Sequence, residues 1–272
     1  MAVKLIVCDL DGTLMSTDHT TVTPRTIRAL RSAHERGIKT AIATGRCLAL
    51  TDGVTQQLEF IDYVITGNGA AAYDRAAKKN ICTDSIQNET AKKVIEYFLD
   101  KEVFFEVYVN GRSQYQLGTE KYFCNEGFPE GFIDEVQSVM DGHGDLLEYL
   151  GDRDIEKITL YSVKDSDYCA YKSKMLEYGL NAVTSFPGNL EATAQGASKG
   201  TALKMLCEKL KIDRSQVMSF GDAENDCSML EYAGLSFAME NGSDACKASA
   251  KYITESNADD GVARAVEKYA LV

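Results

Sequence analysis

The sequence lacks three features that would narrow its class at once: a long apolar run, a paired-cysteine motif and an excess of basic residues. No run of 18 apolar residues occurs among the 272, so no membrane-spanning helix is expected. The eight cysteines include no Cys-x-x-Cys pair and are expected to be reduced, mostly buried thiols. With 29 basic and 41 acidic residues the net charge is −12, which disfavours nucleic acid and anionic membranes as partners.

The length and the first residues set further bounds. A chain of 272 residues can form one large α/β domain or two smaller ones. The apolar stretch before Asp9 is too short for a signal peptide, so we expect a cytoplasmic protein. Nothing in the sequence predicts the oligomeric state.

A short apolar run at residues 4–8 stops at two carboxylates, Asp9 and Asp11, and Gly12 follows directly. The run predicts a buried parallel strand, and ligands of open α/β sheets bind at the carboxyl ends of such strands. Side chains alternate along extended backbone, so Asp9 and Asp11 should point the same way. Two adjacent acids predict a metal site, an acid/base pair, or both.

Strands and helices alternate on both sides of a central segment. Thr23 and Pro24 begin a predicted helix that Gly37 ends, because Thr is a good N-cap, Pro fits the first helical position and Gly fits the C-cap. This alternation predicts a parallel sheet. The other elements expected here are strands at 38–43, 63–65, 190–193, 217–220 and 235–239 and helices at 47–58, 200–210, 245–250 and 261–269.

The central segment, residues 83–187, differs in composition. It holds 16 of the 24 Phe and Tyr residues, with 20 acidic and only 10 basic residues. Residues 103–109 and 157–163 read as strands with one face exposed, and residues 89–100 and 166–178 as helices. We therefore expect an inserted α+β domain. Its aromatic residues could stack on a sugar ring or could simply form the core of a sheet.

Three further clusters of polar residues lie at predicted strand ends or helix starts. Thr44-Gly45 can form an anion site, although Thr44 could also be a plain helix N-cap. Lys199 begins a helix, where most lysines are simply solvated. In Gly221-Asp222-x-x-Asn225-Asp226, three polar side chains crowd the end of an apolar strand, which is a sharper signal.

Taken in order, these four motifs resemble those of the haloacid dehalogenase superfamily of phosphatases, and nearly the whole chain is similar to its Cof-type branch. The resemblance implies a Rossmann-like, doubly wound parallel sheet with an inserted α+β cap. The boundaries that we expect are 1–82 and 188–272 for the core and 83–187 for the cap. Residues 240–243 depart from the branch pattern, at a place expected to lie away from the motifs.

The resemblance also implies roles for individual residues. Asp9 would be the nucleophile and Asp11 the acid and base, its side chain held off the metal so that it can keep a proton. Mg²⁺ would be bound by Asp9, Asp222 and the backbone carbonyl of Asp11, with Asp226 orienting Lys199 or a metal-bound water. The groups expected to contact phosphate or substrate are the backbone of the loop at Leu10, Thr44, Gly45, Arg46, Asn68, Lys199 and Asn225.

The expected reaction is hydrolysis of small phosphate monoesters, sugar phosphates first among them. A phosphomannomutase-like mutase is an alternative, but its cap should carry a basic cluster for a second phosphate, and the cap has only Arg112 and Arg153 as arginines. A non-catalytic phosphate-binding protein is the other alternative. It would be favoured if a motif residue were missing, and none is.

Overall fold

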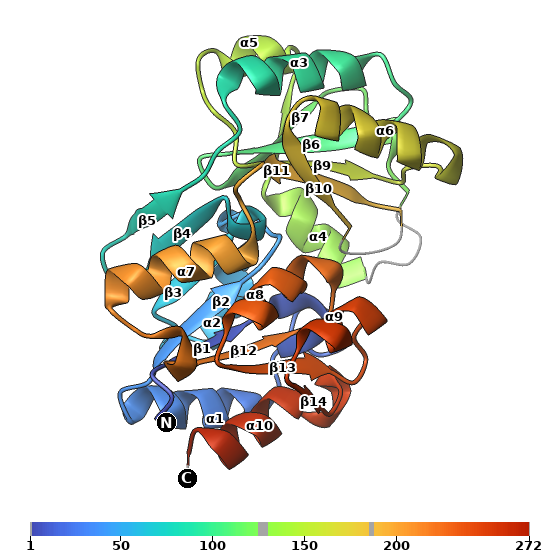
Figure 1. Ribbon diagram of the computed structural model, residues 1–272. Coiled ribbons are helices and arrows are strands. Elements are labelled where there is room, and N and C mark those ends of the chain that lie inside the picture. The colour runs from blue at the N-terminus through green and yellow to red at the C-terminus, as the bar shows by residue number, and fades with distance from the viewer. Residues whose placement is uncertain (1, 125–129, 185–187, 272) are drawn as a thin grey trace.

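The computed structural model describes residues 2–124, 130–184 and 188–271, with the side chains of residues 130–132 excepted. Two α/β bodies lie one above the other, with both chain ends on the lower one (Figure 1). The lower body is called the core and the upper one the cap. Within these described residues, no helix is long and apolar enough to cross a membrane.

The core is built on an eight-stranded sheet whose first six strands are parallel, as the alternation of elements predicted. Its last two strands form antiparallel pairs. In spatial order the strands are β14 (Tyr252–Thr254), β13 (Leu235–Met239), β12 (Val217–Gly221), β1 (Leu5–Cys8), β2 (Lys39–Ala43), β3 (Tyr63–Thr66), β4 (Ala71–Asp74) and β5 (Lys79–Thr83).

Helices cover both faces of this sheet, which makes the core doubly wound. One face packs against α1 (Pro24–Glu35), α2 (Asp52–Gln57) and α10 (Gly261–Tyr269). The other face packs against α7 (Lys199–Leu210) and α8 (Cys227–Tyr232). A short α9 (Asp244–Ser249) lies beside α8.

Local sequence signals explain where α1 begins and ends. The Thr23 hydroxyl accepts a hydrogen bond from the Thr26 N–H at 3.2 Å, which satisfies one of the amides at the helix start. Gly37 has φ of +84°, a conformation that costs little only for glycine, and it turns the chain from α1 into β2. The predicted single helix at 47–58 is instead a 3₁₀ turn at Ala49–Thr51 followed by α2.

The cap has its own six-stranded sheet, with helices on one face and α4 (Glu130–Ser138) near the other. Its helices α3 (Asn88–Leu99), α5 (Leu146–Leu150) and α6 (Asp165–Glu177) cover the first face. In spatial order its strands are β10 (Leu180–Val183), β11 (Leu190–Ala194), β9 (Lys157–Tyr161), β6 (Phe104–Val109), β7 (Arg112–Gln116) and β8 (Met140–His143).

Two expectations about the cap were wrong. The strand predicted at 190–193 exists, but as β11 it pairs with β9 and β10 in the cap sheet and not in the core. Leu190 and Ala192 pack into the apolar core of the cap, while Glu191 and Thr193 are buried on the opposite face, so the strand has the burial pattern of a core strand. The second wrong expectation was that β6 and β9 each have one exposed face. Both faces are covered, because α4 and the core lie against the face that the other cap helices leave open.

The chain crosses between the two bodies twice, and the crossings are neighbours. The first follows β5 at Thr83, and the second joins β11 to α7. A Cβ atom added to Gly196 in the second crossing would lie 2.8 Å from Asp84 Oδ2 in the first. The cap therefore leaves the core and returns to it at a single place.

Candidate active site

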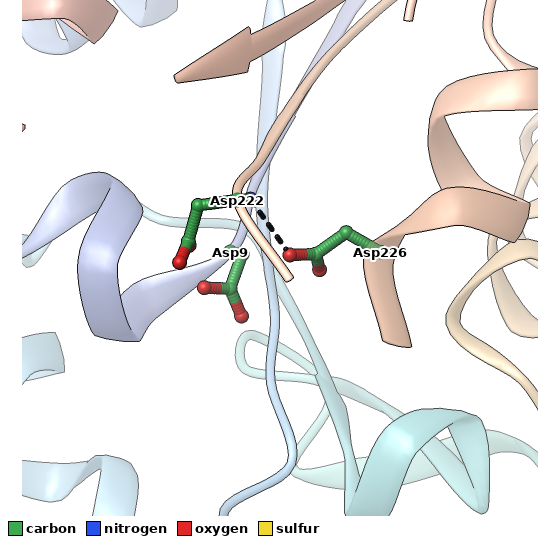
Figure 2. A group of neighbouring side chains, drawn as sticks. All are labelled: Asp9, Asp222 and Asp226. Carbon is green, nitrogen blue, oxygen red and sulfur yellow. Dashed lines mark hydrogen bonds between the residues drawn. The ribbon is translucent and has the colours of Figure 1, made fainter. Parts of the chain in front are cut away.

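The carboxyl ends of β1 and β12 bring the first and fourth motifs together. The two strands are parallel neighbours, with Cys8 opposite Phe220, and the Asp9 N–H donates to the Phe220 carbonyl at 3.0 Å. Asp9 and Asp222 therefore lie side by side at the edge where the sequence predicted a ligand (Figure 2). Gly12 has φ of +81°, and a Cβ there would lie 2.4 Å from Asp222 Oδ2, so only glycine fits this turn.

Lys199 enters this acidic group from the first turn of α7. Ser198 caps the helix by accepting a hydrogen bond from the Thr201 N–H at 3.0 Å, which fixes the start of α7. Lys199 Nζ then donates to Asp9 Oδ1 at 2.5 Å and to Asp226 Oδ1 at 2.7 Å. Its side chain is fully buried, so this lysine is part of the site and not a solvated surface residue.

Asp226 approaches from the side opposite Asp9 and Asp222 (Figure 2). Its Oδ2 atom accepts hydrogen bonds from the backbone N–H groups of Asp222 at 2.9 Å and Ala223 at 3.0 Å. With Lys199 on Oδ1, both oxygens are engaged. Of the two roles considered for Asp226, these contacts describe the orientation of Lys199.

The group carries more negative than positive charge, and this perturbs the pKa values. Burial and the nearby Asp226 raise the pKa of Asp9 well above its usual value, although Lys199 opposes the shift. Burial and Asp226 also raise the pKa of Asp222 to about 7. The hydrogen bond that Thr13 donates to Asp222 Oδ1 at 2.6 Å acts in the opposite direction and lowers this pKa. Burial alone would lower the pKa of Lys199, but Asp226 and Asp9 raise it, so it stays charged.

A divalent cation fits this arrangement. One oxygen from each of Asp9, Asp222 and Asp226 lies within 4.8 Å of the other two, and the oxygens of Asp226 already accept hydrogen bonds, so Asp9 and Asp222 are the side chains left to bind a cation. Carboxylate oxygens are the ligands that Mg²⁺ prefers, and a second cation would relieve the repulsion that Lys199 alone leaves.

Asp11 is held apart from this group by Arg46. The guanidinium reaches it twice, Nε to Oδ2 at 2.9 Å and Nη2 to Oδ1 at 2.6 Å, and His19 Nδ1 lies 3.0 Å from Oδ1. Burial would raise the pKa of Asp11, but Arg46 and His19 outweigh it and bring the pKa below its usual value. The side chain therefore points to Arg46 and His19 and favours its ionised form here, whereas its position relative to a metal and its protonation when a leaving group departs stay predictions.

Thr44, Gly45 and Asn68 lie on two neighbouring loops after β2 and β3, and Asn225 follows β12. Thr44 is buried, and its Oγ1 accepts a hydrogen bond from the Arg46 N–H at 3.1 Å. Asn68 has φ of +55°, and its Oδ1 accepts from Asn225 Nδ2 at 3.0 Å. Gly45 lies so close that a Cβ would be 3.0 Å from Asn68 Oδ1. Contacts of these residues and of the Leu10 backbone with a substrate stay predictions.

Several residues of the site were missed or misjudged from the sequence. Thr13 lies within the first motif but was given no role, His19 follows that motif, and Lys157 and Glu191 come from the cap. A charged residue inside an apolar strand is costly unless paired, and this signal could have identified Lys157 and Glu191. Residues 240–243 do not lie away from the motifs: Asn241 Nδ2 donates to the Gly12 carbonyl at 2.8 Å, and the Ser243 N–H to that of Asp222.

Comparisons with known proteins agree with this site. A family model described as haloacid dehalogenase-like hydrolase matches residues 6–266. The Bacillus subtilis 5-amino-6-(5-phospho-D-ribitylamino)uracil phosphatase YcsE is 29% identical over 99% of this chain and 96% of its own. The Escherichia coli pyridoxal phosphate phosphatase YbhA is 28% identical over the full length of both chains. The solved structure of BT4131, a sugar phosphatase of subclass IIB, covers 99% of this chain and 100% of its own, with a TM-score of 0.85 and 25% identity.

The chain belongs to the haloacid dehalogenase-like hydrolases. Within that family it is a phosphoric monoester hydrolase of the Cof-type branch, with the Rossmann-like core and inserted cap that the sequence predicted.

Proposed function

We propose that the protein is a Mg²⁺-dependent phosphatase that hydrolyses small phosphate monoesters through an aspartyl-phosphate intermediate. The observation that carries this proposal is the convergence of Asp9, Asp222 and Lys199 at adjacent strand ends, with Asp11 held separately nearby. Mg²⁺ held by Asp9, Asp222 and the Asp11 carbonyl would supply positive charge beside a dianionic phosphate.

The first half-reaction assigns Asp9 as the nucleophile. Lys199 engages Asp9 Oδ1 and keeps the carboxylate fixed, so we assign Oδ2 as the attacking atom. A bond forms between Oδ2 and phosphorus, and the bond to the leaving-group oxygen breaks. Lys199 then offers its charge to a phosphate oxygen, where the Thr44 hydroxyl and the backbone N–H groups at Leu10 and Gly45 are further donors.

The protons gained and lost in the two half-reactions lead us to assign Asp11 as the acid and then the base. The leaving oxygen must gain a proton, and the water that hydrolyses the aspartyl phosphate must lose one, so a single carboxyl group can serve both steps. Arg46 and His19 favour the ionised form of Asp11, and this supports the base role. For the acid role we assign His19, whose pKa the hydrogen bond to Asp11 raises, as the group that delivers the proton to Asp11.

The substrate class follows from the charges that the cap presents. Within the described residues, the cap cation that hydrogen-bonds to a core loop is Lys157, and it is already paired with Glu191 at 2.7 Å. Arg112 pairs with Asp141, and Arg153 donates to the Leu150 carbonyl. This favours an uncharged leaving group, such as that of a sugar or polyol phosphate, over the second phosphate that a mutase must bind. Sugar, ribityl and pyridoxal phosphates are named as substrates of relatives.

The test is phosphate release from a panel of sugar, polyol and pyridoxal phosphates, with Mg²⁺ or with EDTA. The wild type should turn over only with Mg²⁺, and Asp9→Asn should lower kcat by about 10³-fold or more, because no other residue replaces the nucleophile. Turnover that survives in Asp9→Asn would contradict the covalent route. If no ester is cleaved, a sugar bisphosphate activator tests the mutase, and phosphate binding without turnover would favour the non-catalytic binder.

A further inference from the structure

Two buried charged residues of the cap reach into the core at the active site. Lys157 on β9 and Glu191 on β11 are 1% and 4% exposed, and they pair with each other at 2.7 Å. Their strand neighbours Ile158 and Leu190 pack into the apolar core of the cap, so alternation turns both charged residues toward the core domain. Neither belongs to the four motifs, yet each contacts a different loop of the site.

Lys157 holds the loop that carries Thr44. Its Nζ donates to the Gly45 carbonyl at 2.6 Å. That carbonyl belongs to the same peptide group as the Arg46 N–H, which donates to Thr44 Oγ1 at 3.1 Å. Lys157 thereby fixes the tilt of this peptide group. Since Thr44 Oγ1 already accepts a hydrogen bond, its own proton is available to an anion in the site.

Glu191 sets the orientation of two side-chain amides in turn. A carboxylate only accepts, so Asn68 must present its amino group to Glu191 Oε2, at 2.5 Å. The Asn68 carbonyl oxygen then faces Asn225, which must present its own amino group, at 3.0 Å. One N–H of Asn225 is used in this contact and the other remains as a donor. The negative charge of Glu191 therefore determines that Asn225 offers hydrogen, and not oxygen, to a phosphate.

We propose that Lys157 and Glu191 are positioning residues of the active site, through which the cap orients the phosphate-binding loops of the core. This inference rests on the proposed phosphatase function. The two charges neutralise each other within the cap, so separating the cap from the core breaks two charge-assisted hydrogen bonds to neutral groups and exposes no lone charge. The Thr44 and Asn225 donors are then correctly directed only while the cap is in place.

The experiment compares Glu191→Gln and Lys157→Met with the matched control Glu106→Gln. Glu106 is buried on the same face of the cap sheet, but Ser113 and Tyr161, which donate hydrogen bonds to it, are cap residues. For each variant we would measure kcat/KM with a small ester and the dissociation constant of orthophosphate by calorimetry, below the unfolding transition. Glutamine at 191 would place an amino group against that of Asn68 or the ammonium of Lys157.

Glu191→Gln and Lys157→Met should each lower kcat/KM about 10- to 100-fold and weaken orthophosphate binding in parallel. Glu106→Gln should lower the thermal midpoint while both constants stay near those of the wild type. The inference is overturned if the two variants bind and turn over like the wild type, or if Glu106→Gln loses as much. A wild type that neither cleaves esters nor binds orthophosphate would instead remove the proposed function, and this inference with it.

Discussion

Arg46 contacts Asp11 with two nitrogens, and this contact sets the protonation state of the residue assigned as acid and base. Arg46→Met should raise the pKa of Asp11, because the opposite charge that favours the ionised form is gone. Asp11 acts as a base only when ionised, so the acid-side fall of kcat/KM should move to higher pH. Arg25→Met is the control, since Arg25 makes a similar two-nitrogen contact with Glu267 on the surface. An unmoved pH profile in Arg46→Met would contradict the assignment.

Lys199 is the cation that lies within the buried acidic group. Lys199→Met should lower the free energy of unfolding by about 3 kcal/mol in EDTA, because it leaves carboxylates buried without their partner. This loss of unfolding free energy should be larger at pH 8 than at pH 5, because at pH 5 the carboxyl groups take up protons and need no cation. Urea unfolding at the two pH values measures the loss. Lys174→Met, which breaks an ion pair with the exposed Glu177, should leave the free energy of unfolding close to that of the wild type.

At the scale of elements, the turn between β3 and β4 is fitted against the start of α7. Gly69 has φ of +100°, and a Cβ there would lie 2.1 Å from the Ser198 carbonyl oxygen. Gly69→Ala should therefore lower the free energy of unfolding by about 3 kcal/mol, because left-handed strain and the displaced backbone add together. It should also lower kcat, because Lys199 moves. Gly37→Ala is matched, because Gly37 also has positive φ but nothing within 4 Å. Gly37→Ala should lower the free energy of unfolding by about 1 kcal/mol and leave kcat unchanged. If urea unfolding gives the same loss for both variants, the steric argument is wrong.

The elements that the sequence predicted well are those with a local physical signal. The apolar run before Asp9, the N-cap at Thr23 and the start of α7 at Lys199 all depend on neighbours within one or two turns, and the structure has them. β7 and β8 were not predicted, because Arg112–Gln116 and Met140–His143 are mostly polar and become strands only by pairing with each other and with β6.

The site divides in the same way. The convergence of Asp9, Asp222 and Lys199 follows from parallel topology, which the sequence indicated. The sequence could not indicate that β11 belongs to the cap sheet. Glu191 and Thr193 are buried, so the strand looks like one that is covered on both faces, as the strands of the core are. The lowered pKa of Asp11 was also beyond prediction, since it depends on where the guanidinium of Arg46 lies.

For the whole molecule, the acidic group makes stability depend on pH and on divalent cations. The pKa of Asp222 is raised to about 7 and that of Asp9 is also raised. Protonation therefore favours the folded state, and this contribution, complete below about pH 4, is lost as the pH rises through 7. In EDTA the thermal midpoint should fall between pH 5 and pH 8. Excess Mg²⁺ should raise the thermal midpoint more at pH 8 than at pH 5. At pH 8 the carboxyl groups are ionised, so the cation does not have to displace protons from them.

Scanning fluorimetry at both pH values, with and without Mg²⁺, measures this difference. Asp222→Asn is the comparison, and it should lose most of the increase caused by Mg²⁺. An increase of the same size at pH 5 and pH 8 would show that protons and the cation do not compete for this group.

The two neighbouring crossings at Asp84 and Gly196 have a consequence for how the protein can vary. A segment whose ends meet at one point can be lengthened, shortened or exchanged without separating the strands that it interrupts. The catalytic sheet can thus stay constant while the inserted body is replaced as a module. A chimaera that joins this core at these two points to the insert of a relative should fold and keep Asp9, Asp222 and Lys199 in register, and its choice of ester should follow the insert.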